Sequence, residues 1–365
     1  MKLTVNSLLS LATLVLCVWL VWPDAQTRTE LGAVFERIEL AAFWPYLAGY
    51  VGLLVVVQVC RSLRWNDLLA PLGVRIPVLP LLAISSVGYM AIMALPARLG
   101  ELVRPGLLRQ RGDLSASAAL GTIAVERIFD GLLVSLFVFV ALFAQRGPAA
   151  PGWMMPTAYA ALGVFTAATL FLVFALRRPA ATVRFCVGVT LLPKFAPRIA
   201  RGLERRLLEM IGGFLVIKKP RYVVRFACWT MVYWIANGVG VCLLADGLGL
   251  ELSVLGGFAS MGLCAVGVML PNSPGMIGQF QYFTLLGLGL YLGFDARADA
   301  AAQPQVYFTA YALANIHYAL QLSWYVLCGA LGLASPYVSL SDLRGSRKAA
   351  AAELEGVPQV NEVAP

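Results

Sequence analysis

The sequence predicts an all-α, polytopic membrane protein with two pseudo-related halves, about six full spans and one or two re-entrant helical hairpins. Of its 365 residues, 60% are hydrophobic and only 13% are charged, whereas about a quarter of an ordinary soluble domain is charged. Several charge-free runs reach the roughly 20 residues that an α-helix needs to cross a bilayer. These observations exclude a soluble monomer. The runs cover residues 3–23, 40–60, 76–97, 147–176, 226–245, 252–294 and 300–341.

The distribution of lysine and arginine predicts the orientation, because cytoplasmic loops of membrane proteins carry an excess of these residues. Residues 177–225 contain twelve of them, opposed only by Glu204 and Glu209, so we expect this segment in the cytoplasm. The same bias predicts that the N-terminus and the C-terminus are both cytoplasmic.

The first two predicted helices cover about residues 5–22 and 43–60. With Lys2 in the cytoplasm, the first helix carries Arg28 and Arg37 to the outside. The second helix returns the chain to the cytoplasm. We expect three basic residues to follow it there: Arg61, Arg64 and Arg75.

Residues 76–111 are predicted to form a re-entrant hairpin. The next two helices, at about 125–144 and 154–176, cross the membrane as a pair and end at the basic cytoplasmic segment. The chain must therefore already be cytoplasmic before this pair. Because Arg75 is also cytoplasmic, an even number of crossings must lie between Arg75 and the pair. The simplest solution is that the charge-free run enters the membrane, turns at Leu95-Pro96 and returns. Polar groups at that depth are tolerated only inside protein or beside an aqueous cavity.

Residues 252–294 are predicted to form a second hairpin, interrupted by Pro, Asn, Ser and Gly at 271–275. Both hairpins contain Ser-x-Gly followed by Leu-Pro, which indicates an internal repeat: Ser86, Gly88, Leu95 and Pro96 in the first, and Ser260, Gly262, Leu270 and Pro271 in the second. Interrupted segments in corresponding halves point to a substrate site between them. The charge bias leaves open whether the second hairpin is re-entrant or crosses twice.

We therefore divide the chain into one membrane domain, residues 1–340, and a disordered cytoplasmic tail, 341–365. The domain comprises a first half (about 1–176), a basic connector (177–225) and a second half (226–340). Apolar residues recur at helical spacing between positions 195 and 214, with arginines elsewhere on the helix. This pattern predicts an amphipathic basic helix on the inner leaflet.

Ionisable residues inside a membrane span indicate function by default. This chain concentrates them in two places: Arg98, Glu101 and Arg104 in the first hairpin, and Glu126, Arg127 and Asp130 at the head of the next helix. Arginine's planar fork suits bidentate binding of a phosphate. We expect Arg98 and Arg104 to bind an anionic head group while Glu101 and Asp130 orient them. The alternative is that the six charges neutralise one another and hold the hairpin to the helix.

The motifs Arg98-x-Gly100-Glu101-x-x-Arg104, Glu126-Arg127-x-x-Asp130 and Pro274-Gly275-x-x-Gly278 resemble the lysyl-phosphatidylglycerol synthase transmembrane, or flippase-like, superfamily over about residues 5–335. The resemblance implies a bacterial inner-membrane protein with re-entrant helices that handles phospholipids or lipid-linked sugars. It further implies a stand-alone member without the aminoacyl-transferase domain of fused members. Two positions depart from the family: Met276 replaces a glycine, and Gln281 stands where the family has an acid. Gln281 cannot titrate, so we do not transfer a proton role to it.

His317 shares a helix face with Gln321, which predicts an interhelical hydrogen-bond pair rather than a proton relay. The seven cysteines include no Cys-x-x-Cys pair and most lie in apolar runs, so we interpret them as small hydrophobic residues. Zinc spacing, a phosphate-binding glycine loop and a nucleophile elbow are also missing from the sequence. We expect no metal and no cofactor.

Three functions remain open. The first, which we favour, is a flippase-like transporter of an anionic phospholipid or polyprenyl-phosphate-linked lipid. The second is a membrane-embedded transferase with Glu101, Glu126 or Asp130 as general base, and the third is a scaffold for a separate enzyme. The excess of lysine and arginine in the predicted cytoplasmic loops accounts for the net charge of +9. We therefore expect the membrane and its lipids as partners and no nucleic acid. Homo-oligomerisation stays open.

Overall fold

The computed structural model describes most of the chain, and what it describes is helical. The fold class predicted from sequence, an all-α polytopic membrane protein, is confirmed. The predicted helix at about 5–22, apart from Val15, and almost all of the predicted tail lie outside the described residues. The described residues are 15, 25–95, 100–110, 114–144, 152, 154–189, 197–212, 214, 219–269, 274–294, 304–339 and 341–342.

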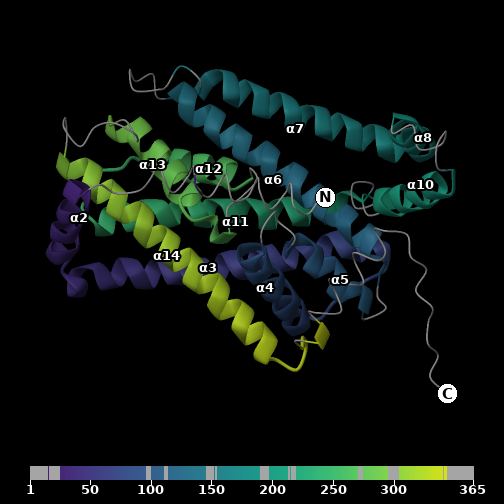
Figure 1. Ribbon diagram of the computed structural model, residues 1–365, viewed down its shortest axis with the longest axis horizontal. Coiled ribbons are helices and arrows are strands. Elements are labelled where there is room, and N and C mark those ends of the chain that lie inside the picture. The colour runs from purple at the N-terminus through teal and green to yellow at the C-terminus, as the bar shows by residue number, and fades with distance from the viewer. Residues whose placement is uncertain are drawn as a thin grey trace.

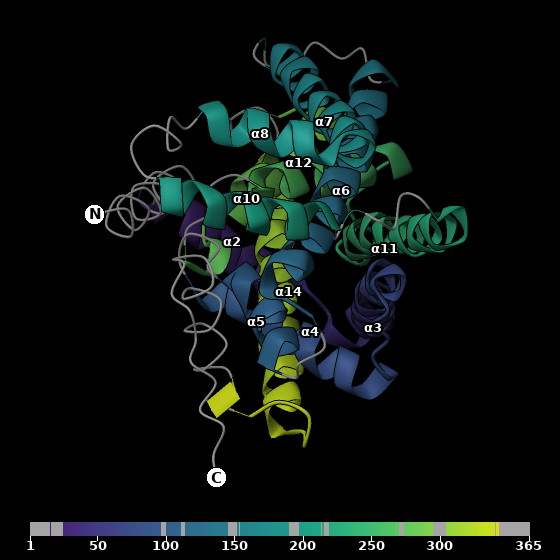
Figure 2. The same cartoon turned by 90° about the vertical axis from the view of Figure 1, so that its right-hand side faces the viewer.

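Long helices run along the longest axis of the molecule (Figure 1). A short helix, α2 (Ala25–Arg37), lies at one end, and α8 (Pro179–Val189) and α10 (Pro197–Gly212) lie at the other, as Figure 2 shows from that second end. The long helices are α3 (Leu40–Leu69), α6 (Ala116–Ala144), α7 (Met154–Arg177) and α11 (Pro220–Gly247), with α14 (Pro304–Ala334) crossing obliquely.

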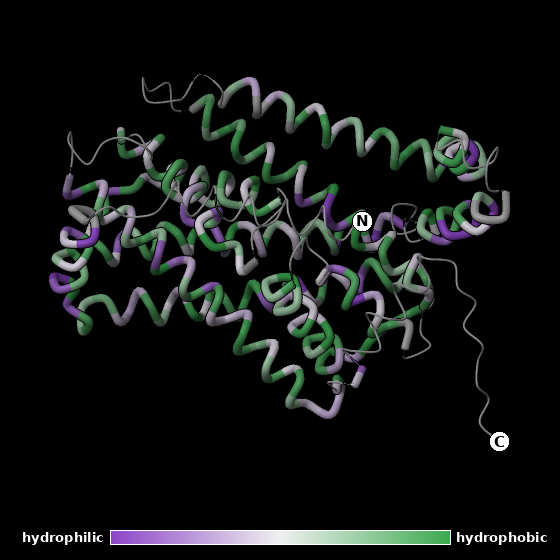
Figure 3. Tube along the Cα trace, in the orientation of Figure 1, coloured by the Kyte–Doolittle hydropathy of each residue, from purple (hydrophilic) through white to green (hydrophobic). Residues whose placement is uncertain are grey.

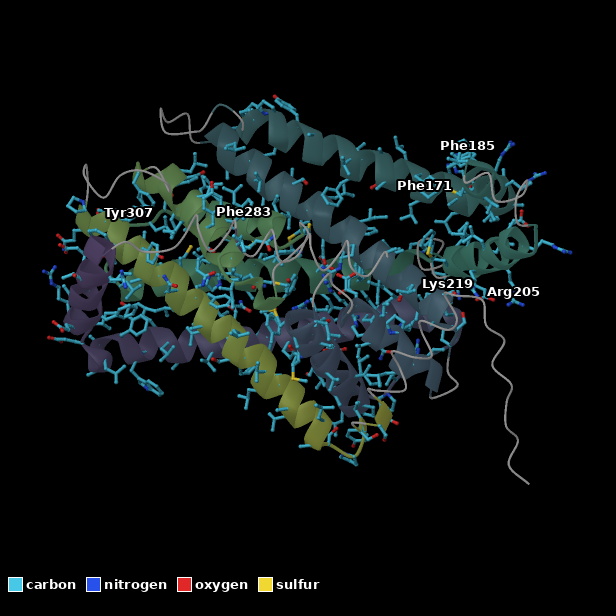
Figure 4. The ribbon with its side chains drawn as sticks, viewed as in Figure 1. Phe171, Phe185, Arg205, Lys219, Phe283 and Tyr307 are labelled. Carbon is cyan, nitrogen blue, oxygen red and sulfur yellow. The ribbon has the colours of Figure 1, made fainter. Side chains whose placement is uncertain are left out.

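The long helices are apolar and present apolar side chains outward. Within the described residues, three segments are long and apolar enough to cross a bilayer: Leu40–Leu72, Pro220–Gly247 and Pro304–Ala334. Phe171 on α7 and Phe185 on α8 are 46% and 68% exposed, as side chains facing lipid would be (Figure 4). Hydrophilic residues gather on α2 and α10, near the two ends (Figure 3). The protein is a multi-pass membrane protein.

The second predicted helix extends further than hydropathy indicated. We expected it to end near residue 60, but α3 continues to Leu69, and a 3-10 turn then leads to Gly73, whose φ of 84° ends the helix. Arg61 and Arg64 therefore lie inside α3 and are buried, not in a loop after it. The helix can continue through these charges because other helices supply their partners.

Both predicted hairpins are present as helix pairs. The first joins α4 (Val78–Ala94) to α5 (Val103–Gln110), and the second joins α12 (Val254–Met269) to α13 (Gln279–Leu292) through the 3-10 turn η4 (Pro274–Met276). In the first, a Cβ at Gly100 would overlap the backbone of Ala91 and Ile92, so only glycine permits this close approach. Their re-entrant position in the membrane stays a prediction.

The two halves interlock. The most extensive helix packing joins α3 of the first half to α11 of the second, and α14 packs along α4. Gly329 and Gly332 on α14 make this possible, because a Cβ at either would meet Met90, Ala83 or Val87 of α4. The turn η4 also contacts α4. The tip of the second hairpin is thereby brought against the first hairpin.

The connector contains the predicted amphipathic helix, α10, but its apolar face is covered. Ala200 and Ile211 are buried, and Leu203, Leu207 and Met210 pack against the core cluster beside α6. Much of this face packs inside the protein, and the position of α10 at the inner leaflet stays a prediction. Arg201 and Arg205 are exposed, and Arg205 lies at the end of the molecule (Figure 4).

Candidate functional site

The centre of the molecule holds a buried cluster of ion pairs around Arg64. Its Nη1 donates to Oδ1 of Asp130 at 2.6 Å, and its Nη2 donates to Oε1 of Glu126 at 2.6 Å and to Oδ2 of Asp130 at 2.9 Å. The exposed fractions of these three side chains are 0%, 2% and 0%. Glu126 and Asp130 are four residues apart and so share one face of α6. One guanidinium therefore satisfies both carboxylates.

Arg104 completes this cluster from the first hairpin. Its Nη1 and Nη2 both donate to Oε2 of Glu126 at 3.2 Å, and its guanidinium lies 4.0 Å from the centre of the Trp65 ring. Gly88 on α4 leaves room for the arginine stem, which a Cβ there would overlap. The structure thus brings Arg104, Glu126 and Asp130 together. This arrangement fits the alternative given above, in which the charges neutralise one another and hold the first hairpin to α6.

A cavity of about 130 Å³ lies beside the cluster and between the two halves. This volume holds several water molecules or one small polar group. Residues from α3, α4, α6, α11, α12, η4, α13 and α14 line it, so it forms only when both hairpins are in place. The cavity lies where the two hairpins meet, and its use as the predicted substrate site stays a prediction.

Two arginines that line the cavity have no carboxylate partner among the described residues. Arg127 is one position after Glu126, so it points about 100° away around α6, and its guanidinium makes no hydrogen bond with any described residue. Arg61 donates only to the Tyr325 hydroxyl, at 2.7 Å, and stacks 3.7 Å from the centre of the Tyr89 ring. The Nε atoms of both arginines are buried without a partner.

The site therefore carries an excess of positive charge. Our sequence analysis counted six charges that cancel, but the structure adds two arginines, Arg61 and Arg64. Among the described residues, four arginines (Arg61, Arg64, Arg104 and Arg127) and three carboxylates (Glu101, Glu126 and Asp130) leave one positive charge. Uncompensated charge in a low-dielectric interior is unfavourable. The cavity is thus suited to an anion.

Two further predicted residues, Arg98 and Glu101, are not found in the described lining of the cavity. Arg98 lies outside the described residues. Glu101 is partly buried within electrostatic reach of Arg127 but does not line the cavity. No signal in the sequence pointed to Arg61 and Arg64, because they follow an apolar run directly and resemble a cytoplasmic flank.

The second-half loop shapes the cavity wall. Gly275, with φ 69°, accepts a hydrogen bond at its carbonyl from the Tyr318 hydroxyl at 2.8 Å, and Gly278 has φ 77°. Pro274 opens the turn. Gln281 accepts a hydrogen bond from the Gly278 N–H at 2.9 Å, so its amide caps α13 and does not line the cavity.

Met276, the other departure from the family pattern, lines the cavity. Its φ is 58°, in the left-handed region that favours glycine. The residue that replaces the family's glycine therefore contributes an apolar side chain to the wall.

The predicted interhelical hydrogen bonding is present at Gln321 and absent at His317 among the described residues. Gln321 donates to the Tyr50 hydroxyl at 3.1 Å, across to α3, and His317 packs edge-on against Tyr50 and Phe280. Its buried Nδ1 has no partner among the described residues. Both side chains line the cavity. In the described part of the chain, no group of three His, Cys, Asp or Glu residues is arranged to hold a metal ion.

The fold and the cavity define a multi-pass helical membrane protein with a positively charged internal site between its halves. The chain belongs to the lysylphosphatidylglycerol synthase TM region family, whose sequence model matches residues 7–303. Glycosyltransferase AglD of Haloferax volcanii is 26% identical over 287 residues, which are 71% of this chain and 46% of that relative. The chain thus spans about half the length of this relative. No solved structure matches this chain.

Proposed function

We propose that this protein binds the phosphate of an anionic lipid in the cavity and moves that lipid between the leaflets of a bacterial inner membrane. The observation that carries the proposal is the pair of arginines, Arg61 and Arg127, that line the cavity without a carboxylate partner among the described residues. A guanidinium offers a planar fork that matches a phosphate. An anion entering here offsets charge that the protein itself leaves uncompensated.

The proposal assigns different roles to the arginines than the sequence did. Arg64 and Arg104 are engaged by Glu126 and Asp130, so they hold the hairpin against α3 and α6. Arg127 and Arg61 are available to the ligand. Arg98 and Glu101 keep their predicted roles, binding the head group and orienting the arginines, as part of this proposal.

A transferase is the second candidate, because the printed name of the haloarchaeal relative is a glycosyltransferase. Such an enzyme requires a carboxylate free to accept a proton. Glu126 and Asp130 each accept hydrogen bonds from arginine, which disfavours this role for them. A transferase would modify an added lipid in the presence of an activated donor, and a transporter would only relocate it.

The test of transport combines two measurements on the full chain. Lipids that co-purify in mild detergent are identified by mass spectrometry, and movement of a labelled anionic lipid is followed in reconstituted vesicles. We expect enrichment of one anionic lipid over the bulk membrane and faster movement than in protein-free vesicles. A co-purified lipid profile that matches the bulk membrane, together with lipid movement no faster than in protein-free vesicles, would contradict the proposal. The scaffold for a separate enzyme would then be the remaining function.

We further propose that α2 faces the outside and α10 faces the cytoplasm. Glu36 on α2 and Arg205 on α10 are both exposed and lie at opposite ends of the molecule. In a background without native cysteines, needed because Cys228 is exposed, we expect Glu36→Cys to react with an impermeant thiol reagent on intact cells and Arg205→Cys to react only after lysis. The reverse pattern would invert the topology. A probe at Ala200 would be silent from both sides, because that side chain is buried.

A further inference from the structure

We infer that the tip of the second hairpin, the turn η4, is a gate of the cavity and that the Tyr318 hydroxyl holds this gate closed. The inference rests on the proposed function and concerns how a lipid passes through the protein. Three features of the structure support it: the size of the cavity, the backbone of the tip, and the hydrogen bonds that fasten the second hairpin at its two ends.

The cavity is too small for a lipid head group to cross while its walls stay in place. Its volume is about 130 Å³, and a single water molecule takes about 30 Å³ in the liquid. A lipid that changes leaflet needs a continuous path for its head group, so one element of the wall has to move. The wall includes Met276 of η4, whose side chain is buried.

The helices around the cavity are fixed by close packing. The α3 helix packs along α11, and α14 packs along α4 at Gly329 and Gly332. Within the second hairpin, a Cβ at Gly287 would overlap the backbone of Ser260, so α12 and α13 are also in backbone contact. Such closely packed helices cannot separate without losing these contacts. The tip η4, by contrast, is a turn.

The backbone of this turn is strained. Met276 has a φ of 58°, and it is the one non-glycine residue with positive φ in the described part of the chain. An L-residue keeps this left-handed conformation only where surrounding contacts impose it, and such strain is concentrated at sites that bind or switch. An outward movement of the tip would release the strain at Met276.

Two contacts hold the tip in its strained position. The Met276 side chain packs in an apolar cluster that includes Ile92 and Met93 of α4. The Tyr318 hydroxyl of α14 donates a hydrogen bond to the carbonyl of Gly275 at 2.8 Å. If this hydrogen bond breaks and Met276 withdraws from the cluster, the cavity becomes larger. The hydroxyl of Tyr318 is therefore placed to control the opening.

The other end of the second hairpin is fastened by a hydrogen bond of the same kind. The Tyr291 hydroxyl, near the end of α13, donates to the carbonyl of Ala141 on α6, also at 2.8 Å. Tyr291 is not part of the described cavity lining. The two tyrosines thus form a matched pair, one at the tip of the hairpin and one at its base. Only the bond at the tip should control passage.

The first experiment compares Tyr318→Phe with Tyr291→Phe in the full-length protein, because each change removes one hydroxyl and keeps the ring. Movement of labelled phosphatidylglycerol is followed in phosphatidylcholine vesicles, and its binding is measured by competition in nanodiscs. We expect Tyr318→Phe to move this lipid about 2- to 10-fold faster, the factor that corresponds to the net contribution of one hydrogen bond. The rate should change more than the affinity. Tyr291→Phe should move the lipid at the native rate.

A second readout does not depend on lipid movement. Cys264 on α12 lines the cavity in the same apolar cluster as Met276 and is buried. In a protein that keeps only this cysteine, the rate of its modification by a small thiol reagent reports how often the tip opens, since a buried thiol reacts only while it is exposed. We expect Tyr318→Phe to raise this rate by the same factor, and Tyr291→Phe to leave it unchanged.

The possible results separate this inference from the proposed function. A native protein that neither binds nor moves phosphatidylglycerol would overturn the proposed function for this lipid, while the modification of Cys264 would still test the gate. If the native protein moves lipid but Tyr318→Phe neither speeds this movement nor exposes Cys264, η4 is not a gate and the function stands. If Tyr291→Phe has the same effects as Tyr318→Phe, both changes loosen the whole hairpin and the gate is likewise overturned.

Discussion

Replacing Arg64 with alanine is expected to abolish stable folding of the protein. The change removes the arginine partner of buried Asp130, which keeps only the Trp234 indole as a donor, and leaves buried Glu126 with Arg104 alone. Removing one partner of a buried ion pair typically costs about 3 to 5 kcal/mol, a large part of the stability of most proteins. Thermal unfolding in detergent and gel-filtration monodispersity measure the effect.

Arg205→Ala on the exposed face of α10 is the control for Arg64→Ala, since it removes an arginine without stranding a buried partner. A double variant, Arg64→Leu with Asp130→Asn, tests the cause. It should recover part of the lost stability, because Asp130 no longer carries an unpaired charge and Glu126 keeps its pair with Arg104. If Arg64→Ala melts at the same temperature as the control, the ion cluster does not hold the bundle together.

Replacing Arg127 with glutamine should have the opposite profile, with function lost and stability kept. No described residue is hydrogen-bonded to Arg127, so its removal breaks no pair that the structure shows. A hydrogen bond to a charged group is worth about 1.5 to 3 kcal/mol, so affinity for an anionic lipid should fall about 10- to 150-fold. Lipid binding and movement in reconstituted vesicles are measured beside the melting temperature.

Two comparisons sharpen the Arg127 experiment. Arg127→Lys should restore binding only in part, because an ammonium group cannot reproduce the bidentate fork. Arg104→Ala should lower both stability and movement, since Arg104 is paired with Glu126. An Arg127→Gln protein that moves lipid at the native rate would remove Arg127 from the site, and one that unfolds like Arg64→Ala would make its role structural.

The elements of the fold could be predicted because their signals are local. Charge-free runs predict helices wherever they occur, and Leu95-Pro96 and the Pro- and Gly-containing run at 271–275 predicted the turns of the two hairpins. The i, i+4 spacing of Glu126 and Asp130 places both on one face of α6, and there both accept hydrogen bonds from Arg64. Such properties belong to a single segment, so they do not depend on how that segment packs against the rest of the chain.

Hydropathy and charge patterning are enough to establish that this chain is a helical membrane protein and to single out six ionisable residues at membrane depth. Which of these charges neutralise each other depends on the packing of the helices. Arg61 and Arg64 look like a cytoplasmic flank in sequence, yet the packing of α3 against α6 and α11 buries them. Arg64 pairs with Glu126 and Asp130. Arg127 is not part of this pairing and lines the cavity. Charge pairing depends on distances between segments far apart in the chain, which hydropathy and spacing do not contain.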